Sequence, residues 1–191
     1  YYAPRNEDFL KANLQGADLV RWRYQRYMHD YLGTVMSVDE SVGRLLKFLD
    51  DEGLAENTIV IFMTDNGHTP DLLFNAGMRG KKGTAHEGGT RVPAFFRWTG
   101  RLHAGTDIGA LTSATDIFPT LAEICGTKIP DSLKLDGRSL VPLLHDPQAA
   151  WPNRFLFTHL GRWERGQVAA AKYKECAVRS QRFRLVNNRE L

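Results

Sequence analysis

The chain has 191 residues, of which 42% are hydrophobic and 25% charged, and its formal net charge is +3. This length and composition are those of a soluble globular protein with one sizeable domain, or one domain and a small appendage. No apolar run approaches the roughly 20 residues that cross a bilayer, which argues against a membrane span. The net charge is too small to predict a nucleic-acid partner.

Positive charge gathers at the C-terminal end. Residues 154–191 contain 9 Lys and Arg against 3 Asp and Glu, or +6, so the rest of the chain carries −3. No recognised nucleic-acid motif accompanies this tail, so we interpret it as a solvated basic face or one that meets an anionic substrate. The two cysteines, Cys125 and Cys176, are too few for a disulfide framework or a zinc site. We expect each to be buried as a small hydrophobe.

The first half predicts a long helix followed by a strand. Apolar residues recur at steps of three and four from Met28 to Leu49, which is typical of one face of an amphipathic helix. Gly53 is its expected left-handed cap. The run Thr58–Met63 is apolar on both faces, which favours a strand in a sheet that is covered on both sides. Helix followed by such a strand indicates α/β layering.

The second half predicts shorter elements. Val92–Trp98 is a second strand candidate, which Pro93 restricts to an edge or to the first residues of a strand. A helix is expected from Thr115–Asp116 to Gly126. Its predicted buried stripe consists of Ile117, Phe118, Leu121, Ile124 and Cys125.

The end of the chain predicts a small second subdomain. Residues 139–144 form a short apolar turn or helix, and 145–153 have the composition of a linker. The β-like runs 155–158, 176–179 and 183–186 favour a small antiparallel sheet. We therefore divide the chain into a core, residues 1–150, and the start of a C-terminal α+β subdomain, residues 151–191.

Two oxygen donors follow the apolar strand directly. Asp65 and Asn66 belong to Thr64-Asp65-Asn66-Gly67. Ligands of open α/β sheets bind beyond the carboxyl ends of strands, and carboxylate and amide oxygens suit Ca²⁺ or Mg²⁺. The alternative is structural, because Asp-Asn-Gly is also a common turn.

A glycine-rich basic loop, residues 77–93, comes next. Its glycines allow backbone N–H groups to approach an anion, and Lys82 supplies a compact positive charge. A mobile surface loop with solvated lysines is the alternative. Lys81-Lys82 lacks the spacing of a phosphate-binding P-loop, and His86-Glu87 lacks the second His of a zinc-protease helix. Glu87 and Arg91 are spaced to form an ion pair that would brace the loop.

Two histidines are candidates for contact with a ligand. His68 follows the Asp-Asn-Gly turn and could donate to a substrate oxygen or transfer a proton. His159 lies beside Gly161-Arg162-Trp163 and could line a pocket. A structural or solvated role is the alternative for both, and for His86 near the lysines.

Together these motifs resemble the sulfatase family of the alkaline-phosphatase-like superfamily. The matching segments follow one another as 38–46, 57–67, 83–93, 116–121 and 135–140. The resemblance implies an alkaline-phosphatase-like sandwich, with helices on both faces of a mixed sheet. It also implies that Asp65 and Asn66 coordinate Ca²⁺, with Mg²⁺ as an alternative, and that Lys82 contacts the sulfate. A catalytic role for His68 and a substrate contact by His159 are further expectations.

The departures from the family are equally informative. The family's nucleophile is a formylglycine, made from Cys or Ser in Cys/Ser-x-Pro-x-Arg, and these 191 residues contain no such motif. Nor do they contain the paired aspartates that complete the family's metal site. We therefore expect the chain to be a middle-to-C-terminal part of a sulfatase that is inactive alone and needs the N-terminal half of the core.

Two rival functions stay open at this point. One is a phosphatase or phosphonate hydrolase of the same superfamily, which the nucleophile motif would distinguish. The other is a non-catalytic module that binds sulfated glycans through Arg179, Arg182 and Arg184. The expected substrate is a sulfated small molecule or glycan, whose identity the sequence does not give. Loops 69–76 and 158–176 are expected to shape its pocket, and the resemblance suggests a periplasmic, secreted or lysosomal location.

Overall fold

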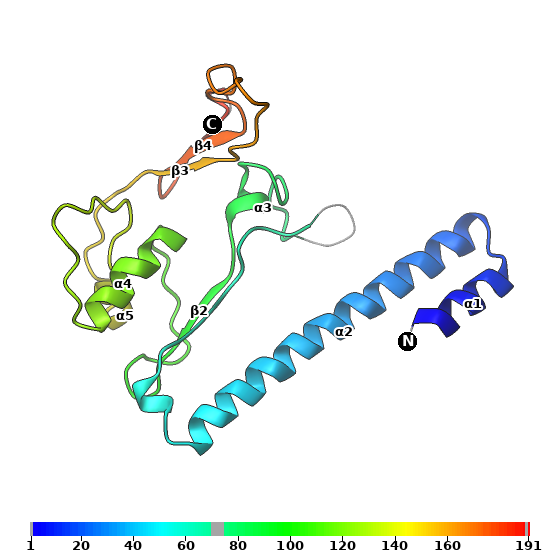
Figure 1. Cartoon of the computed structure of the whole chain (residues 1–191), viewed down its shortest axis with the longest axis horizontal. Coiled ribbons are helices and arrows are strands. Elements are labelled where there is room, and N and C mark those ends of the chain that lie inside the picture. Colours follow the sequence, from blue (N-terminus) through cyan, green and yellow to red (C-terminus); the bar gives the residue numbers. More distant parts are fainter. Residues whose placement is uncertain (1, 70–74, 190) are drawn as a thin grey trace. The chain divides into compact units, whose positions relative to one another are not determined.

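The structure is a computed structural model that describes residues 2–69, 75–189 and 191, so part of the expected pocket loop 69–76 lies outside the described residues. The chain separates into two compact units, Tyr1–Thr58 and Ile59–Leu191. Figure 1 shows the elements of both units, coloured along the sequence. Among the helices described, none combines the length and apolar character that a membrane crossing requires.

The first unit is a helical hairpin. Helix α1 (Tyr2–Ala12) is followed by the long helix α2 (Gly16–Asp51) and a short 3-10 helix, η1 (Ala55–Asn57). The rings of Phe9 and Trp22 stack with centroids 4.4 Å apart, and Arg5 donates to Asp30 at 3.2 Å. These contacts hold α1 against the first turns of α2.

The predicted end of α2 is confirmed. Gly53 has a φ of 66°, and the N–H of Leu54 donates to the carbonyl of Leu49 at 2.8 Å. This left-handed cap satisfies carbonyls that the helix end would leave free. The apolar face of α2 is largely exposed within its unit, since Val35 is 47% and Leu45 51% exposed.

The second unit contains two antiparallel sheets. Strand β1 (Val60–Met63) pairs with β2 (Ala94–Arg97), with Val60 opposite Arg97 and Met63 opposite Ala94. Both predicted strands are therefore found, each shorter than expected. The described residues of this unit do not cover both faces of the strand pair, because Phe62 and its partner Phe95 are exposed.

The C-terminal sheet has the order β3 (Leu156–His159), β4 (Cys176–Arg179), β5 (Arg184–Val186). His159 lies opposite Cys176, and Arg179 lies opposite both Leu156 and Arg184. This sheet confirms the three β-like runs at the end of the sequence. Figure 1 shows β3 and β4 beside the short helix α3 (Glu87–Thr90), which ends the lysine loop.

A polar network connects the helices that come between the two sheets in the sequence with the chain just before β3. The 3-10 helix η2 (Ala114–Asp116) leads into α4 (Ile117–Ile124), and α5 is Val141–His145. Asp116 is fully buried and accepts from Arg154 at 2.8 Å and from the N–H of Arg138 at 2.8 Å. The chain around residue 154 is thereby fixed to the start of α4. The domain boundary near residue 150 stays a prediction.

Two predictions about burial are wrong. The buried positions of α4 are Pro119 and Thr120, whereas Phe118 is 55% exposed and Cys125 is exposed. The Thr120 hydroxyl donates to the backbone carbonyl of Asp116 and accepts from the N–H of Leu140, the latter at 2.8 Å, and these bonds hold Thr120 in the interior. Hydrogen bonding, and not the apolar stripe alone, therefore sets which face of α4 is inside. Cys176 is only partly buried, so neither cysteine is a core residue.

Candidate active site

The turn after β1 presents oxygen atoms at the strand's carboxyl end. The Asn66 amide nitrogen donates to the carbonyl of Gly67 at 2.9 Å, and the hydroxyl of Thr64 donates to the carbonyl of Asn66 at 3.2 Å. These bonds fix the turn and leave the amide oxygen of Asn66 available. The Asp65 carboxylate is exposed and has no hydrogen-bond or ion-pair partner among the residues that the structure describes.

The lysine loop is bonded directly to this turn. The N–H of Lys82 donates to the carbonyl of His68 at 2.8 Å, and the N–H of Gly67 donates to the carbonyl of Gly89 at 3.0 Å. Within the loop, the Thr84 hydroxyl donates to the carbonyl of Lys81 at 2.8 Å. The structure therefore joins the backbone of the turn that contains Asp65, Asn66 and His68 to the backbone of Lys82.

The contact between the two segments requires glycine at its centre. A Cβ at Gly67 would overlap the carbonyl oxygen of Gly88, and one at Gly89 would overlap the carbonyl oxygens of Thr84 and Lys81. A side chain at Gly67 would separate the turn from the loop, and one at Gly89 would distort the loop itself. The glycines of Asp-Asn-Gly and of Glu-Gly-Gly thus serve the close backbone approach that builds the site.

His68 carries the one histidine nitrogen that is buried without a hydrogen-bond partner in the described part of the chain, Nδ1. An unsatisfied buried polar atom costs free energy, so it marks a position where a ligand or water completes the hydrogen bonding. The backbone oxygen of the same residue is bonded to Lys82. His68 is thus fixed between the turn and the lysine loop.

The donors at the turn fit a hard cation in kind but not in number. Asp65 and Asn66 supply oxygen atoms of the type that Ca²⁺ and Mg²⁺ bind, whereas Ca²⁺ takes about 6–8 oxygen ligands. The residues that the structure describes contain no cluster of three or more His, Cys, Asp or Glu that could hold a metal ion. The two side chains are thus a partial ligand set.

Glu87 joins the lysine loop to the C-terminal sheet. Its carboxylate lies 2.7 Å from Arg179 and 3.3 Å from Arg184, and the predicted pair with Arg91 is also present at 3.5 Å. Burial by itself would raise the pKa of the Glu87 carboxyl. The hydrogen bond and charge of Arg179, with the charges of Arg184 and Arg91, outweigh burial and lower that pKa below its usual value.

The two sheet arginines were not predicted as partners of Glu87. Burial lowers the pKa of the Arg184 guanidinium, the charge of Glu87 opposes this, and the net direction is downward. Arg184 also donates to the carbonyl of Ala85 at 2.7 Å and to the Thr90 hydroxyl at 2.9 Å. Because Arg179 and Arg184 are engaged in this way, they do not form the free basic surface that a glycan-binding module through these residues would need.

His159 lies apart from the other predicted site residues. It is exposed at the end of β3, and its ring stacks on Trp163 with centroids 5.2 Å apart. Both residues line a cavity of about 830 Å³, and none of Asp65, Asn66, His68 and Lys82 lines it. His159 thus borders a cavity that these residues do not line, and its contact with a substrate stays a prediction.

The chain combines hard oxygen donors at the end of a strand with a lysine loop that is hydrogen-bonded to them through the turn. This combination is typical of metal-assisted hydrolases that act on oxyanion esters. The family model described as Sulfatase matches residues 2–127, and that described as N-sulphoglucosamine sulphohydrolase, C-terminal, matches residues 80–190. The chain belongs to the sulfatase family.

Individual relatives agree with this assignment. The chain is 31% identical over 191 residues to the N-acetylglucosamine-6-O-sulfatase of Bacteroides thetaiotaomicron, a match that covers 97% of this chain and 32% of that protein. It is 38% identical over 138 residues to the uncharacterized sulfatase YdeN of Escherichia coli, covering 70% of this chain and 24% of the relative. The chain thus spans about a quarter to a third of the length of these curated relatives.

Solved structures show the same fold. BT4656, solved in complex with its substrate D-glucosamine-2-N,6-O-disulfate, is similar with a TM-score of 0.64 and 30% identity, over 96% of this chain and 36% of that one. A phosphonate monoester hydrolase of Agrobacterium radiobacter is similar with a TM-score of 0.56 and 26% identity, over 81% and 31%. These neighbours support the predicted alkaline-phosphatase-like α/β fold.

Proposed function

We propose that this chain supplies the metal- and sulfate-binding part of a sulfuric ester hydrolase. The observation that carries the proposal is the pair of backbone hydrogen bonds between the turn and the lysine loop, from Lys82 to His68 and from Gly67 to Gly89. They hold the loop of Lys82 next to a turn that contains two hard oxygen donors, Asp65 and Asn66. Membership in the sulfatase family supports the same conclusion.

Each of the four residues has a role in this proposal. Asp65 and Asn66 are two ligands of a Ca²⁺ or Mg²⁺ ion, which would offset negative charge on the sulfuryl oxygens. The Lys82 ammonium binds a sulfuryl oxygen and stabilises the charge that develops there. His68, whose Nδ1 has no partner among the described residues, donates a hydrogen bond or proton toward the ester oxygen.

The nucleophile is proposed to be a formylglycine outside these 191 residues. Neither Cys125 nor Cys176 lies in a Cys/Ser-x-Pro-x-Arg motif. Further metal ligands are also needed, because two side chains do not complete the coordination of Ca²⁺. On this proposal the isolated chain has no turnover, and the N-terminal half of the core is its partner.

The proposed substrate is a sulfated sugar. One relative is named an N-acetylglucosamine-6-O-sulfatase, and BT4656 was solved with D-glucosamine-2-N,6-O-disulfate as its substrate. A sulfated amino sugar is therefore the first substrate to test. A periplasmic, secreted or lysosomal location is proposed on family grounds, since sulfated glycans are encountered outside the cytoplasm.

The decisive experiment compares Lys82→Ala with Lys134→Ala in the full-length protein, with an aryl sulfate and glucosamine 6-O-sulfate as substrates. Lys134 is an exposed lysine outside the site, so its variant controls for loss of charge. We expect K82A to lower kcat/KM about 10²- to 10³-fold and K134A to leave it unchanged. Absence of sulfate release, with hydrolysis of a phosphonate monoester instead, would move the protein to the phosphonate hydrolases of the superfamily.

A further inference from the structure

A cavity opens at the end of the C-terminal sheet opposite to Glu87. It has a volume of about 830 Å³, and its lining includes the end of β3, the loop that follows and residues 187–189. Such a volume is in the range of small-molecule sites. The roles proposed for Asp65, Asn66, His68 and Lys82 leave this cavity unused.

An aromatic platform forms part of its wall. Trp163 stacks on His159 at 5.2 Å and remains 40% exposed. An exposed indole supported from one side offers a rigid apolar face with little conformational entropy to lose. The C–H face of a sugar ring is the kind of surface that packs on such a platform.

Cations surround the platform. The cavity lining contains four of them against two carboxylates, Glu164 and Glu175, for a net charge of 4 − 2 = +2 with His159 neutral. The four are Arg162, Lys172, Lys174 and Arg189. Within the described ranges none of the four forms an ion pair with a carboxylate, although Lys172 lies 5.0 Å from the ring centroid of Tyr173. Unpaired cations beside an aromatic face favour a ring that carries anionic groups.

The backbone around the cavity contains left-handed residues, a conformation that costs free energy for Tyr173 and Glu175 and less for the two asparagines. Of the six non-glycine residues with positive φ in the described chain, four line this cavity. They are Tyr173, Glu175, Asn187 and Asn188. Such conformations gather at ligand sites, where the surrounding structure enforces them. The wall is thus shaped by more than a relaxed surface loop.

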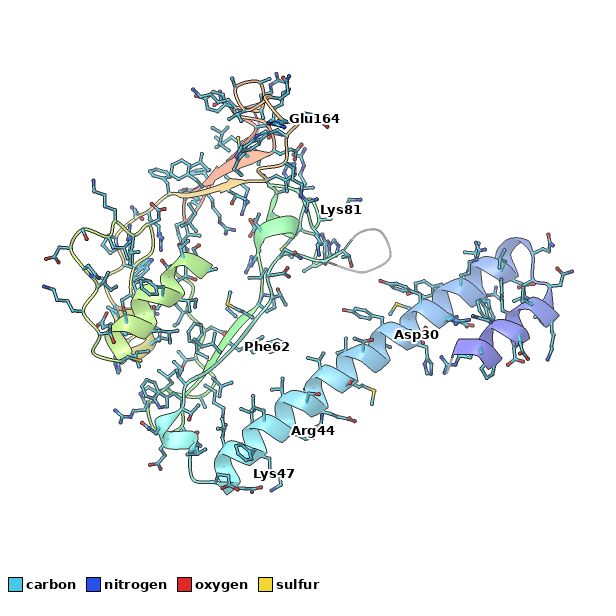
Figure 2. All side chains as sticks on the ribbon, in the orientation of Figure 1. Asp30, Arg44, Lys47, Phe62, Lys81 and Glu164 are labelled. Atoms are coloured by element: carbon cyan, nitrogen blue, oxygen red, sulfur yellow. The ribbon has the colours of Figure 1, made fainter. Side chains whose placement is uncertain are left out.

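The cavity lies one short strand from the lysine loop. Strand β4 runs from Cys176, opposite His159, to Arg179, whose guanidinium contacts Glu87. Three residue steps along a strand span roughly 10 Å. Figure 2 labels Glu164, on the cavity lining, and Lys81, in the lysine loop. A ligand that extends beyond one sugar ring would reach from one site toward the other.

We propose that this cavity is a subsite for a neighbouring anionic sugar residue of the substrate, one that is bound but not cleaved. The inference rests on the proposed function, because it takes the lysine loop as the site of ester cleavage. Trp163 stacks on the ring of the neighbouring sugar, and the cations of the loop bind its sulfate or carboxylate. The enzyme thus acts on sulfated oligosaccharides in preference to monosaccharide esters.

The test measures binding of a heparin-derived tetrasaccharide by calorimetry in the full-length protein. Trp163→Ala and the double variant Lys172→Gln/Lys174→Gln are compared with Lys134→Gln, an exposed lysine far along the chain from the cavity residues. We expect each cavity variant to raise Kd about tenfold, Trp163→Phe to restore most of the affinity, and K134Q to have no effect. The kcat/KM for glucosamine 6-O-sulfate stays unchanged in all of them.

Four results would contradict these proposals. An unchanged tetrasaccharide Kd in W163A, or an equal loss of activity on the monosaccharide, would overturn the subsite. Single-stranded DNA that binds as tightly as the tetrasaccharide, with the same dependence on Trp163, would also overturn it in favour of a nucleic-acid site. Failure of the wild-type protein to release sulfate from any ester would refute the proposed function, while the calorimetry would still report whether the cavity binds the tetrasaccharide.

Discussion

The carboxylate of Glu87 lies 2.7 Å from the guanidinium of Arg179, although 92 residues separate the two in the sequence. Glu87 begins α3 within the lysine loop, and Arg179 ends β4. Arg184 of β5 contacts the same carboxylate at 3.3 Å. This joint fixes the C-terminal sheet to the loop that carries Lys82, so the two proposed ligand sites are mechanically connected through one acidic side chain.

The first prediction is that Glu87→Gln destabilises the second unit. An amide keeps the shape but loses the charge that offsets two partly buried guanidinium groups, of which Arg184 is only 14% exposed. We expect a loss of about 1–2 kcal/mol in the free energy of unfolding, measured by chemical denaturation.

The matched control for this change is Asp131→Asn. Asp131 pairs with Lys128 at 3.8 Å, and both side chains are more than 80% exposed. Exposed pairs contribute little, so the control should change stability by less than about 0.5 kcal/mol. Equal effects of the two variants would show that the Glu87 joint is no stronger than a surface pair.

The second prediction concerns pH. The pKa of Glu87 is lowered in the folded chain, where Arg179 and its neighbours outweigh burial. The unfolded chain therefore binds more protons than the folded chain near the ordinary Glu pKa of about 4.3. The stabilisation by Glu87 is fully present above that pH and is lost as pH falls through the lower folded pKa.

This sign is checked by the difference in unfolding free energy between wild type and E87Q, followed from pH 7 downward. The difference should be constant at neutral pH and shrink below about pH 4. A difference that grows on acidification would mean that folding raises the pKa of the Glu87 carboxyl, contrary to the lowered pKa given above.

Local signals made part of this site predictable. The end of α2 at Gly53, the strand before Asp65 and the turn at Asn66 each depend on residues that are close in sequence. Turn chemistry and the change from apolar to polar residues are sufficient to predict them. The assignment of the turn to a metal and of Lys82 to the sulfate followed from the family resemblance, because the motifs alone left a structural role open for both.

Contacts between residues that are far apart in the sequence could not be predicted in the same way. Glu87 was assigned only its near neighbour Arg91, since nothing local indicates that Arg179 and Arg184 reach the same carboxylate. The apolar stripe predicted that Phe118 would lie on the buried face of α4, whereas Phe118 is exposed and a hydrogen-bond network buries Thr120. Periodicity reports where apolar residues recur, but burial depends on partners supplied by distant segments.

The third prediction is that Gly67→Ala separates the turn from the lysine loop. The new Cβ would overlap the carbonyl oxygen of Gly88, so one backbone segment must move. We expect a loss of about 1–3 kcal/mol and faster hydrogen exchange at the N–H of Lys82, which donates to His68.

Gly109→Ala is the control for that substitution, because a Cβ at Gly109 has open space around it. Its stability should change by less than about 0.5 kcal/mol. Unchanged exchange at Lys82 in G67A would indicate that the hydrogen bond to His68 does not depend on the close approach of Gly67.

The fourth prediction is that Asp65→Asn weakens binding of Ca²⁺ to the full-length protein by at least about 10- to 100-fold, because a neutral amide replaces the charged ligand. Calorimetric titration with Ca²⁺ measures this effect. Asp107→Asn, at an exposed aspartate in another loop, should leave the affinity unchanged. Wild-type affinity in D65N would exclude Asp65 as a ligand, and hydrolysis that survives removal of divalent ions by EDTA would exclude a metal requirement.

The last prediction concerns the buried ion pair between Arg154, which precedes the C-terminal sheet, and Asp116 at the start of α4. Arg154 is 8% exposed and donates to both carboxylate oxygens of Asp116 at 2.8 Å, and Asp116 is fully buried. Arg154→Met keeps much of the volume but leaves this carboxylate buried without its cation, so we expect a loss of about 3–5 kcal/mol in unfolding free energy. Arg165→Met, at an exposed arginine, should be nearly neutral. If the double variant Asp116→Asn/Arg154→Met recovers much of the loss, the uncompensated charge is the cause; if it does not, the packing of Arg154 against its neighbours is.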